Sequence, residues 1–307
     1  MQTILGSTGT IGKGLAKSLI EFTNKIRLVS RNPVKINESD ELFPADLLDR
    51  DQVFKAVENS EVVYLTAGLQ YKIDVWRTQW PVVMKNVIDA CEAQKARLVF
   101  FDNVYSYGLV DGWMNEGTPL KPTSKKGEVR KQINEMLLNE IESGKLEAMI
   151  LKAADFYGPD TPFSVFNIMV LENLKKGKKA QWLVDDKKKH SLIYTPDAVK
   201  ATALLGNTKS AYNQMWVLPT DKNELTGKEL IELSAKAFGV KPGHMVLSKW
   251  MVKALGFIIP ELKESYEMLY QYENDYLIDS SKFDKTFDFK TTSYENGIAE
   301  TLKSMNK

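Results

Sequence analysis

Three glycines near the start of the chain constrain its fold more than any other feature. Gly6, Gly9 and Gly12 follow an apolar run at 2–5 and begin a helical pattern of apolar residues over 11–22. A GxxGxxG run between a strand and a helix allows a tight turn and close approach of the backbone to a pyrophosphate. The helix start adds amide groups and a positive dipole end. The pattern therefore predicts a dinucleotide-binding βα unit rather than an ordinary glycine-rich turn.

Short apolar runs alternate with helical patterns through the first half of the chain. Further strand-like runs lie at 26–29, 62–65, 98–101 and 149–151, and long helical patterns lie at 74–95 and 125–142. Strands that alternate with helices are joined by right-handed crossovers, which build a parallel sheet covered on both faces. We therefore expect an α/β fold with a Rossmann-type doubly wound parallel sheet.

The pattern changes after about residue 156, where we expect a smaller C-terminal substrate lobe. Helical patterns at 163–176, 196–206, 226–238 and 293–304 alternate with brief strand patterns near 181–184, 191–194 and 213–218. The expected dinucleotide-binding domain spans 1–160, with 187–210 and 276–290 returning to it. The expected lobe spans 161–186 and 211–275, and a C-terminal helix follows at 291–307.

Composition narrows the range of partners. Lys+Arg 41 against Asp+Glu 40 gives a net charge of +1, so no overall field attracts nucleic acid or a membrane. The histidines, His190 and His244, lie far apart in the sequence, so we expect no metal site. Cys91 lies in an apolar helical pattern and is expected to be buried. No apolar run approaches the roughly 18 residues of a membrane span, so we expect a cytoplasmic protein.

The end of the second expected strand bears on the choice of cofactor. Enzymes that prefer NAD usually place an acid about 20 residues past the glycines, where it accepts from the ribose 2′-hydroxyl. This chain has the neutral Ser30 and the cationic Arg31 there. A guanidinium can pair with a 2′-phosphate, so the sequence favours NADP over NAD. The alternative is that Arg31 is a solvated loop residue.

Several later segments also point to one family. They are AlaAspLeuLeuAsp at 45–49, ThrAlaGly at 66–68, AspAsnValTyrSerTyrGly at 102–108, AspPheTyrGlyPro at 155–159, and the stretches at 190–199 and 277–282. With the glycines, they resemble extended or atypical short-chain dehydrogenases/reductases of the NAD-dependent epimerase/dehydratase family, over nearly the whole chain. The glycine turn, the second strand and this resemblance together indicate the cofactor-binding residues Gly6, Thr8, Gly9, Thr10, Ile11, Gly12, Ser30, Arg31, Asp46, Leu47, Thr66, Ala67, Gly68 and Arg130.

The catalytic signature departs from that family. Its members usually carry a Ser or Thr after the fifth strand and a YxxxK pair on the next helix, whereas this chain has Asn103 at the first position and Lys126 and Arg130 as KxxxR. A spacing of four places both cations on one helix face. A neutral Lys126 could act as a general base, and a charged one could donate to a substrate carbonyl oxygen. Asn103 could donate to the same oxygen, and Arg130 could hold ribose hydroxyls.

Further polar side chains near the expected strand ends are candidates for substrate binding. Tyr105, Tyr107 and Tyr157 could replace the missing acid, although tyrosines often fill a pocket wall instead. Asp155 is expected to line the nicotinamide end of the site. His190 is expected to be an isolated, exposed histidine.

Two functions are consistent with these residues. The first is an NADP-dependent oxidoreductase, epimerase or dehydratase that acts by hydride transfer on a small hydroxyl- or carbonyl-bearing substrate. The second is a non-catalytic NADP-binding redox sensor or interaction protein. The polar groups at all three catalytic positions favour the first, and the missing tyrosine favours the second. The long helices at 74–95 and 125–142 would allow a homodimer.

Overall fold

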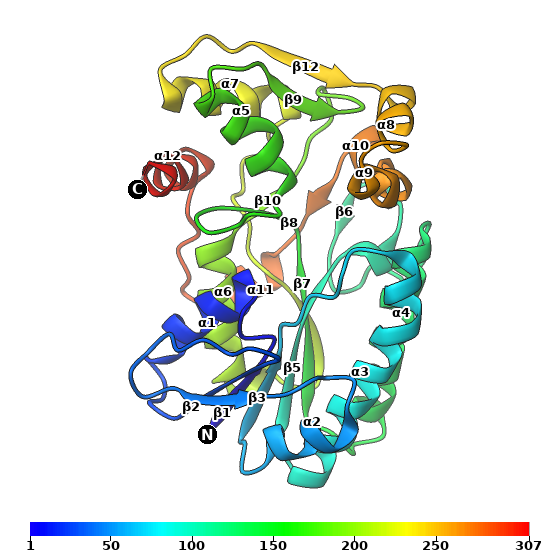
Figure 1. The fold of residues 1–307 in the computed structure, drawn as a ribbon, viewed down its shortest axis with the longest axis vertical. Helices are drawn as coiled ribbons and strands as arrows, with labels where there is room; N and C mark the ends of the chain where they lie inside the picture. Colours follow the sequence, from blue (N-terminus) through cyan, green and yellow to red (C-terminus); the bar gives the residue numbers. More distant parts are fainter. Residues whose placement is uncertain (307) are drawn as a thin grey trace. The chain divides into compact units, whose positions relative to one another are not determined.

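The computed structural model describes residues 1–306 and divides into two compact units (Figure 1). Unit 1 comprises Met1–Ser106, Leu120–Ala153 and Ala198–Trp216, and unit 2 comprises Tyr107–Pro119, Ala154–Asp197 and the chain from Val217 onward.

The boundary differs from the expected one. Residues 107–119, 154–160, 187–197 and 276–290, which the sequence had suggested for the dinucleotide-binding domain, belong to unit 2. Residues 211–216, which were expected in the lobe, belong to unit 1. The reason is strand pairing: β8 (Asp155–Tyr157) pairs with β10 (Leu192–Tyr194), and β13 (Leu277–Ile278) pairs with β6 (Trp113–Met114), so none of them joins the main sheet.

The main sheet has seven strands in the order β11-β7-β5-β4-β1-β2-β3, and the pairings from β3 to β7 are parallel. The strands are β1 (Gln2–Leu5), β2 (Ile26–Ser30), β3 (Glu41–Pro44), β4 (Val62–Leu65), β5 (Arg97–Asn103), β7 (Ala148–Ala153) and β11 (Gln214–Val217). This confirms the expected Rossmann-type fold. The strand order reverses beside β1, between β1 and β4, and ligands of such sheets bind at the carboxyl ends of the strands at that point.

Helices cover both faces of this sheet (Figure 1). They are α1 (Thr10–Leu19), α2 (Arg50–Val57), α3 (Ile73–Gln94), α4 (Lys125–Glu142) and α6 (Thr195–Gly206), with short 3-10 turns η1 (Tyr105–Tyr107) and η3 (Lys209–Ala211). Leu65 and Phe100 face the core formed with α2, α3 and α4, whereas Tyr64 on the opposite face lies against Gly206 of α6. α4 begins where expected, because the Ser124 hydroxyl accepts from the Gly127 amide.

Unit 2 consists of short elements around its own hydrophobic core. Its further strands β9 (Ala180–Leu183) and β12 (His244–Leu247) form a parallel pair. Its helices are α5 (Glu172–Lys175), α7 (Gly227–Phe238), α8 (Lys249–Leu255), α9 (Pro260–Ser265), α10 (Tyr270–Glu273), α11 (Ser281–Thr286) and α12 (Tyr294–Met305), with the π-helix η2 (Asn167–Leu171) and the 3-10 turn η4 (Tyr266–Met268). None of the helices within residues 1–306 has the length and apolar character that crossing a bilayer requires.

Candidate functional site

The glycine turn between β1 and α1 leaves no room for side chains at two of its three glycines. Gly6 has φ +95°, and a Cβ there would lie 2.4 Å from the Cα atom of Ala67. A Cβ on Gly12 would lie 2.5 Å from the carbonyl oxygen of Gly6. The amides of Gly6 and Ser7 both donate to the carbonyl of Val29 at the end of β2. The turn is therefore fixed against β2 and the residues that follow β4.

The third glycine leaves the start of α1 open. Gly9 is the N-cap residue of α1 and is exposed. Because it is a glycine, it provides no side-chain hydrogen bond to cap the helix. The first amides of a helix have no acceptors within the helix, and here Thr10, Ile11 and Gly12 form that first turn. No acidic residue lies in the turn to compete for an anion. The geometry of the turn is consistent with the expected phosphate-binding role of Gly6, Thr8 and Gly9, which stays a prediction.

Two buried hydroxyls flank the turn. The Oγ atoms of Ser7 and Ser30 have no hydrogen-bond partner anywhere in the described chain. Ser30 directly follows Val29, which pairs in register with Leu5, so it lies next to Gly6. Buried polar atoms are normally hydrogen-bonded, and a bound ligand can supply the missing partner. The glycine turn and these two hydroxyls fit the adenosine and pyrophosphate of a nicotinamide dinucleotide. Arg31, the residue after Ser30, is exposed.

The segments after β3 and β4 extend the same edge of the sheet. Leu5 pairs in register with Leu65, so Thr66, Ala67 and Gly68 continue beside the glycine turn. The Thr66 hydroxyl donates to the carbonyl of Leu5 at 3.2 Å. After β3, the Oδ1 atom of Asp46 accepts from the amide of Leu48 at 3.0 Å.

Leu47 is held by its backbone, because its carbonyl accepts from the side-chain amide of Asn86 at 3.0 Å. The carboxylate of Asp46 is half-exposed, so it is accessible at the edge where the adenine is expected. The placement of these residues is consistent with the expected cofactor roles, which stay predictions.

Arg130 on α4 is engaged with the protein core. Its Nε atom donates to the Oδ1 atom of Asp102 at 2.6 Å, and its Nη2 atom forms an ion pair with the same oxygen. Its guanidinium lies 4.3 Å from the centre of the Trp80 ring and 5.0 Å from that of Phe100. The planar guanidinium suits both contacts. These contacts favour a structural role over the ribose contact that the resemblance implied, which stays a prediction.

Lys152 on β7 is a central site residue that the sequence reasoning missed. Its Nζ atom donates to Asp102 Oδ2 at 2.7 Å, to Ser106 Oγ at 2.7 Å, to the carbonyl of Asn103 at 3.3 Å and to Asn134 Oδ1. Asn134 also donates from Nδ2 to Asp102 Oδ2 at 2.7 Å. The signal was a lysine at the end of an apolar strand pattern, where a charge needs a buried partner.

This cluster holds one carboxylate and two cations out of solvent. Burial would raise the pKa of Asp102, but the charges of Arg130 and Lys152 outweigh it and hold that pKa below its usual value. Burial lowers the pKa of Lys152, the charge of Arg130 adds to this, and the attraction of Asp102 does not fully offset it. The cluster therefore ties the ends of β5 and β7 to α4 with a carboxylate that is firmly ionised.

Lys126 is buried at the start of α4 and lies against an aromatic face. Its Nζ atom lies 4.6 Å from the centre of the Tyr71 ring. Tyr71 packs edge-on against Trp76, which stacks on Tyr105. A Cβ on Gly127 would lie 2.6 Å from the carbonyl oxygen of Tyr105, so the first turn of α4 is pressed against η1.

Asn103 precedes the same turn, at the carboxyl end of β5. Its Oδ1 atom accepts from the amide of Tyr105 at 3.0 Å. That bond orients the side chain, and Nδ2 has no acceptor among residues 1–306. The structure thus brings Asn103 and Tyr105 together with the first turn of α4, as the resemblance implied for the catalytic region.

In unit 2, Asp155 is paired with His190, and the expectation that this histidine is isolated and exposed is wrong. His190 Nε2 lies 3.0 Å from Asp155 Oδ2, and its buried ring stacks between Tyr272 and Tyr276 at centroid distances of 4.6 and 4.5 Å. The Tyr272 hydroxyl donates to the same carboxylate oxygen at 3.4 Å. Local sequence patterns could not indicate this arrangement, because the partners come from β8 and from residues after η4.

Two of the three candidate tyrosines are buried. Tyr157 packs against Phe166 and Tyr294 in the core of unit 2, and a Cβ on Gly297 would lie 2.3 Å from its hydroxyl. Burial raises its pKa well above the usual value, which disfavours proton transfer near neutral pH. Tyr107 is equally buried. These observations favour packing for both residues, and the half-buried Tyr105 stays the most accessible of the three.

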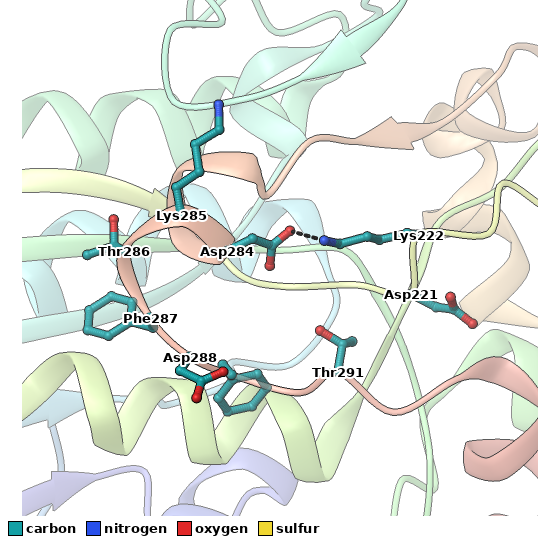
Figure 2. A pocket seen from close by; sticks show the side chains of 9 residues that line it. Asp221, Lys222, Asp284, Lys285, Thr286, Phe287, Asp288 and Thr291 are labelled. Carbon is teal, nitrogen blue, oxygen red and sulfur yellow. Dashed lines mark ion pairs between the residues drawn. The ribbon is translucent and has the colours of Figure 1, made fainter.

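Unit 2 also contains a cleft (Figure 2). Its volume is about 590 Å³, and the Lys222 amine reaches across it to Asp284 at 3.3 Å. It is lined by Asp221, Lys222, Asp284, Lys285, Thr286, Phe287, Asp288, Phe289 and Thr291. None of the residues expected at the site lines this cleft, and its lining is a mixture of cations and carboxylates, so it is not part of the candidate site.

The described residues were also compared with the ligand clusters that hold metal ions. Within residues 1–306, no three His, Cys, Asp or Glu side chains lie close enough together to hold one. Cys91 is buried, as expected, and burial raises the pKa of its thiol well above the usual value.

The model of the NAD dependent epimerase/dehydratase family matches residues 3–217, so the chain belongs to that family. One curated relative is 3beta-hydroxysteroid-dehydrogenase/decarboxylase isoform 2 of Arabidopsis thaliana, which is 26% identical over 151 residues. That match covers 44% of this chain and 25% of the relative, so the chain spans only a quarter of the relative's length.

Solved structures of similar fold include sugar-nucleotide enzymes. A double mutant of dTDP-glucose 4,6-dehydratase from Streptomyces venezuelae, solved with NAD, has a TM-score of 0.80 at 14% identity and covers 100% of this chain and 97% of its own. UDP-glucose 4-epimerase from Thermus thermophilus, also with NAD, has a TM-score of 0.79 at 16% identity, with 100% and 99% covered. At these identities, the likeness shows the fold.

Proposed function

We propose that this chain binds NADP at its glycine turn and acts by hydride transfer on a small substrate with a hydroxyl or carbonyl group, as an oxidoreductase, epimerase or dehydratase. The observation that carries the proposal is the start of α1, where the exposed N-cap Gly9 provides no side-chain cap beside the closely packed Gly6 and Gly12. The solved dehydratase and epimerase of similar fold contain NAD, which supports a nicotinamide dinucleotide.

The chain's own residues would orient the substrate and handle protons, and the cofactor would supply the hydride chemistry. We assign Lys126 the role of a donor to a substrate oxygen, because its Nζ atom lies against the face of the Tyr71 ring at the start of α4. The free Nδ2 of Asn103 would be a second donor. We assign Arg130 a positioning role through Asp102, because that carboxylate takes two of its nitrogens. Substrate contacts of Tyr105 and Asp155 stay predictions.

The preference for NADP rests on Arg31 and can be tested there. Replacing Arg31 with Ala should weaken NADPH binding about 10- to 100-fold, because a charge-assisted bond to the 2′-phosphate is lost. NADH binding should change little. Calorimetric titration with both dinucleotides measures the two effects. Lys35→Ala removes a charge from an exposed residue of the same loop and serves as the matched control. Equal losses for NADPH and NADH in Arg31→Ala would contradict the proposal.

Turnover distinguishes an enzyme from the second candidate function, a non-catalytic NADP-binding sensor, which the missing tyrosine at position 126 favours. A screen of carbonyl substrates should show loss of NADPH absorbance. Lys126→Met should slow that reaction about 10²- to 10³-fold, as expected for a lost donor to a developing oxyanion, with NADPH binding retained.

The exposed neighbour variant Lys125→Met is the control and should keep full activity. Equal activity in Lys126→Met would exclude this lysine as the catalytic residue. NADPH binding without turnover across the screen would support the sensor. The homodimer expected from α3 and α4 and the cytoplasmic location stay predictions.

A further inference from the structure

The loop that joins β2 to β3 carries Arg31 and is attached to the rest of unit 1 on both sides (Figure 1). We call residues 31–40 the β2–β3 loop. Before the loop, the carbonyl of Ser30 accepts from the amide of Ala45 at 2.9 Å, which joins the ends of the two strands. At the other end of the loop, Asp40 is buried, although most of the loop is exposed. A buried carboxylate needs hydrogen bonds, so its partners show what it holds.

Asp40 holds the second half of the β2–β3 loop together. Its Oδ2 atom accepts from the amides of Ile36 at 3.1 Å and Asn37 at 2.6 Å. Its Oδ1 atom accepts from the side-chain amide of Asn37 at 3.1 Å. All three donors belong to the loop itself, and hydrogen bonds to an ionised acceptor are stronger than neutral ones. The carboxylate therefore fixes the backbone around positions 36 and 37.

Asn37 attaches this half of the loop to α1. Its Nδ2 atom, which donates to Asp40, also donates to the carbonyl of Ala16 at 2.9 Å. Ala16 lies in α1, the helix whose first turn is the proposed site of the pyrophosphate. The β2–β3 loop is therefore held against the same helix that would bind the cofactor.

Arg31 lies between the two attachments of the loop. It directly follows Ser30 and precedes Ile36 by five positions. Pro33 stiffens the segment between them, because its ring fixes its own φ and disfavours helical angles at Asn32. The attachments therefore limit the positions that Arg31 can adopt.

A loop that is already ordered loses less conformational entropy when it binds a ligand than a loose loop does. In the proposed function, Arg31 contacts the 2′-phosphate, which NADPH carries and NADH lacks. We propose that Asp40 and Asn37 are positioning residues, which act through Arg31 and determine how strongly NADPH is preferred over NADH. This inference rests on the proposed NADP binding.

Calorimetric titration of Asp40→Ala with NADPH and NADH tests the inference in the full chain. NADPH affinity should fall about 5- to 20-fold, because the loop must be ordered on binding, whereas NADH affinity should stay within about twofold. Asn37→Ala, at a half-buried position, should shift the ratio of the two affinities in the same direction by about 3- to 10-fold. Partial unfolding would instead weaken both dinucleotides by the same factor, so the ratio distinguishes positioning from a purely structural role.

A double-variant cycle tests whether the effect passes through Arg31. When Arg31→Ala is already present, Asp40→Ala should change NADPH affinity by less than about twofold, because residues that act through one another are not additive. An equal loss of NADPH affinity with and without Arg31→Ala would overturn the inference.

Asp197→Ala is the matched control. Asp197 is also a buried carboxylate that holds a loop, because it accepts from the amide and the hydroxyl of Thr292 at 2.6 and 3.0 Å, but it belongs to unit 2. This variant should lose stability in urea and keep the ratio of NADPH to NADH affinity.

Two further results would overturn the inference while the proposed function stands. One is an unchanged ratio in Asp40→Ala and Asn37→Ala, although Arg31→Ala lowers it. The other is a ratio that falls as far in Asp197→Ala as in Asp40→Ala. If the unmodified protein binds neither dinucleotide, the proposed function fails, and this inference fails with it.

Discussion

A Gly9→Asp variant should keep its fold and lose the nicotinamide dinucleotide. Gly9 is the N-cap of α1 with extended backbone angles, which suit aspartate, one of the preferred N-cap residues. Its carboxylate would accept from the amides of Ile11 or Gly12, and its charge would repel a pyrophosphate at the same place. We expect NADPH affinity to fall by more than about 100-fold, because several charge-assisted bonds are lost together. Stability should stay the same or rise by a few tenths of a kcal/mol.

Calorimetric titration and urea unfolding measure the two effects separately. Lys72→Asp is the matched control, because Lys72 is the N-cap of α3 and also lacks a side-chain cap. It should gain similar stability and bind NADPH normally. Gly6→Ala should instead destabilise the fold, since Gly6 has φ +95° and its new Cβ would meet the backbone of Ala67. Unchanged NADPH affinity in Gly9→Asp would show that the phosphates do not bind at α1.

An Asp102→Asn variant should lose about 3–5 kcal/mol of stability, the usual effect of removing one partner from a buried ion pair. Asp102 and Lys152 are both fully buried, and Arg130 shares the same carboxylate. A neutral amide would leave both cations without their anion. Because whole domains are stable by about 5–15 kcal/mol, this single change removes a large share. Urea unfolding at pH 7 measures the loss.

A surface pair provides the control for this variant. Asp89 pairs with the exposed Lys85 at 3.0 Å, so Asp89→Asn should cost less than about 1 kcal/mol. The double variant Asp102→Asn/Lys152→Met should recover part of the loss, because one stranded charge is removed with its partner. A loss in Asp102→Asn no larger than in Asp89→Asn would contradict the structural role of the cluster.

The effect of Asp102 should also depend on pH. Its pKa is lowered in the folded protein, so its carboxylate contributes stability that is fully present above the unfolded value of about 3.9. That stability is lost as the pH falls through the lower, folded pKa. The difference between the unmodified protein and Asp102→Asn should therefore shrink in acid, as urea unfolding between pH 7 and acid conditions would show.

Much of the fold could be predicted from the sequence because parallel strands buried on both faces appear as short, continuous apolar runs. The runs at 2–5 and 62–65 match β1 and β4 residue for residue. The sequence analysis did not predict β3, because β3 is an exposed edge strand that ends in Pro44 and contains no continuous apolar run. The expected helix at 163–176 is present over 165–175, but it contains the π-helix η2, which α5 directly continues and which helical spacing alone could not indicate.

The candidate site could be predicted only where it is local in sequence. Gly6, Gly9 and Gly12 form one turn, so their spacing was sufficient. Lys152 and Asp102 are 50 residues apart and meet only because β5 and β7 are neighbours in the sheet. The same is true of His190 and Asp155, which pairing of β8 with β10 brings together. Contacts of this kind depend on strand order, which local patterns do not specify.

The surroundings of Arg130 bear on any effort to engineer a conventional reductase from this scaffold. The double exchange Lys126→Tyr and Arg130→Lys would restore the residue types of the family's usual YxxxK pair, but not the contacts that Arg130 makes here. A lysine ammonium cannot contact Asp102 through two nitrogens as the guanidinium does, nor reproduce the contacts of that planar group with the Trp80 and Phe100 rings. A designer would have to rebuild positions 102, 134 and 152 in the same step, so this helix face has to be redesigned as a whole.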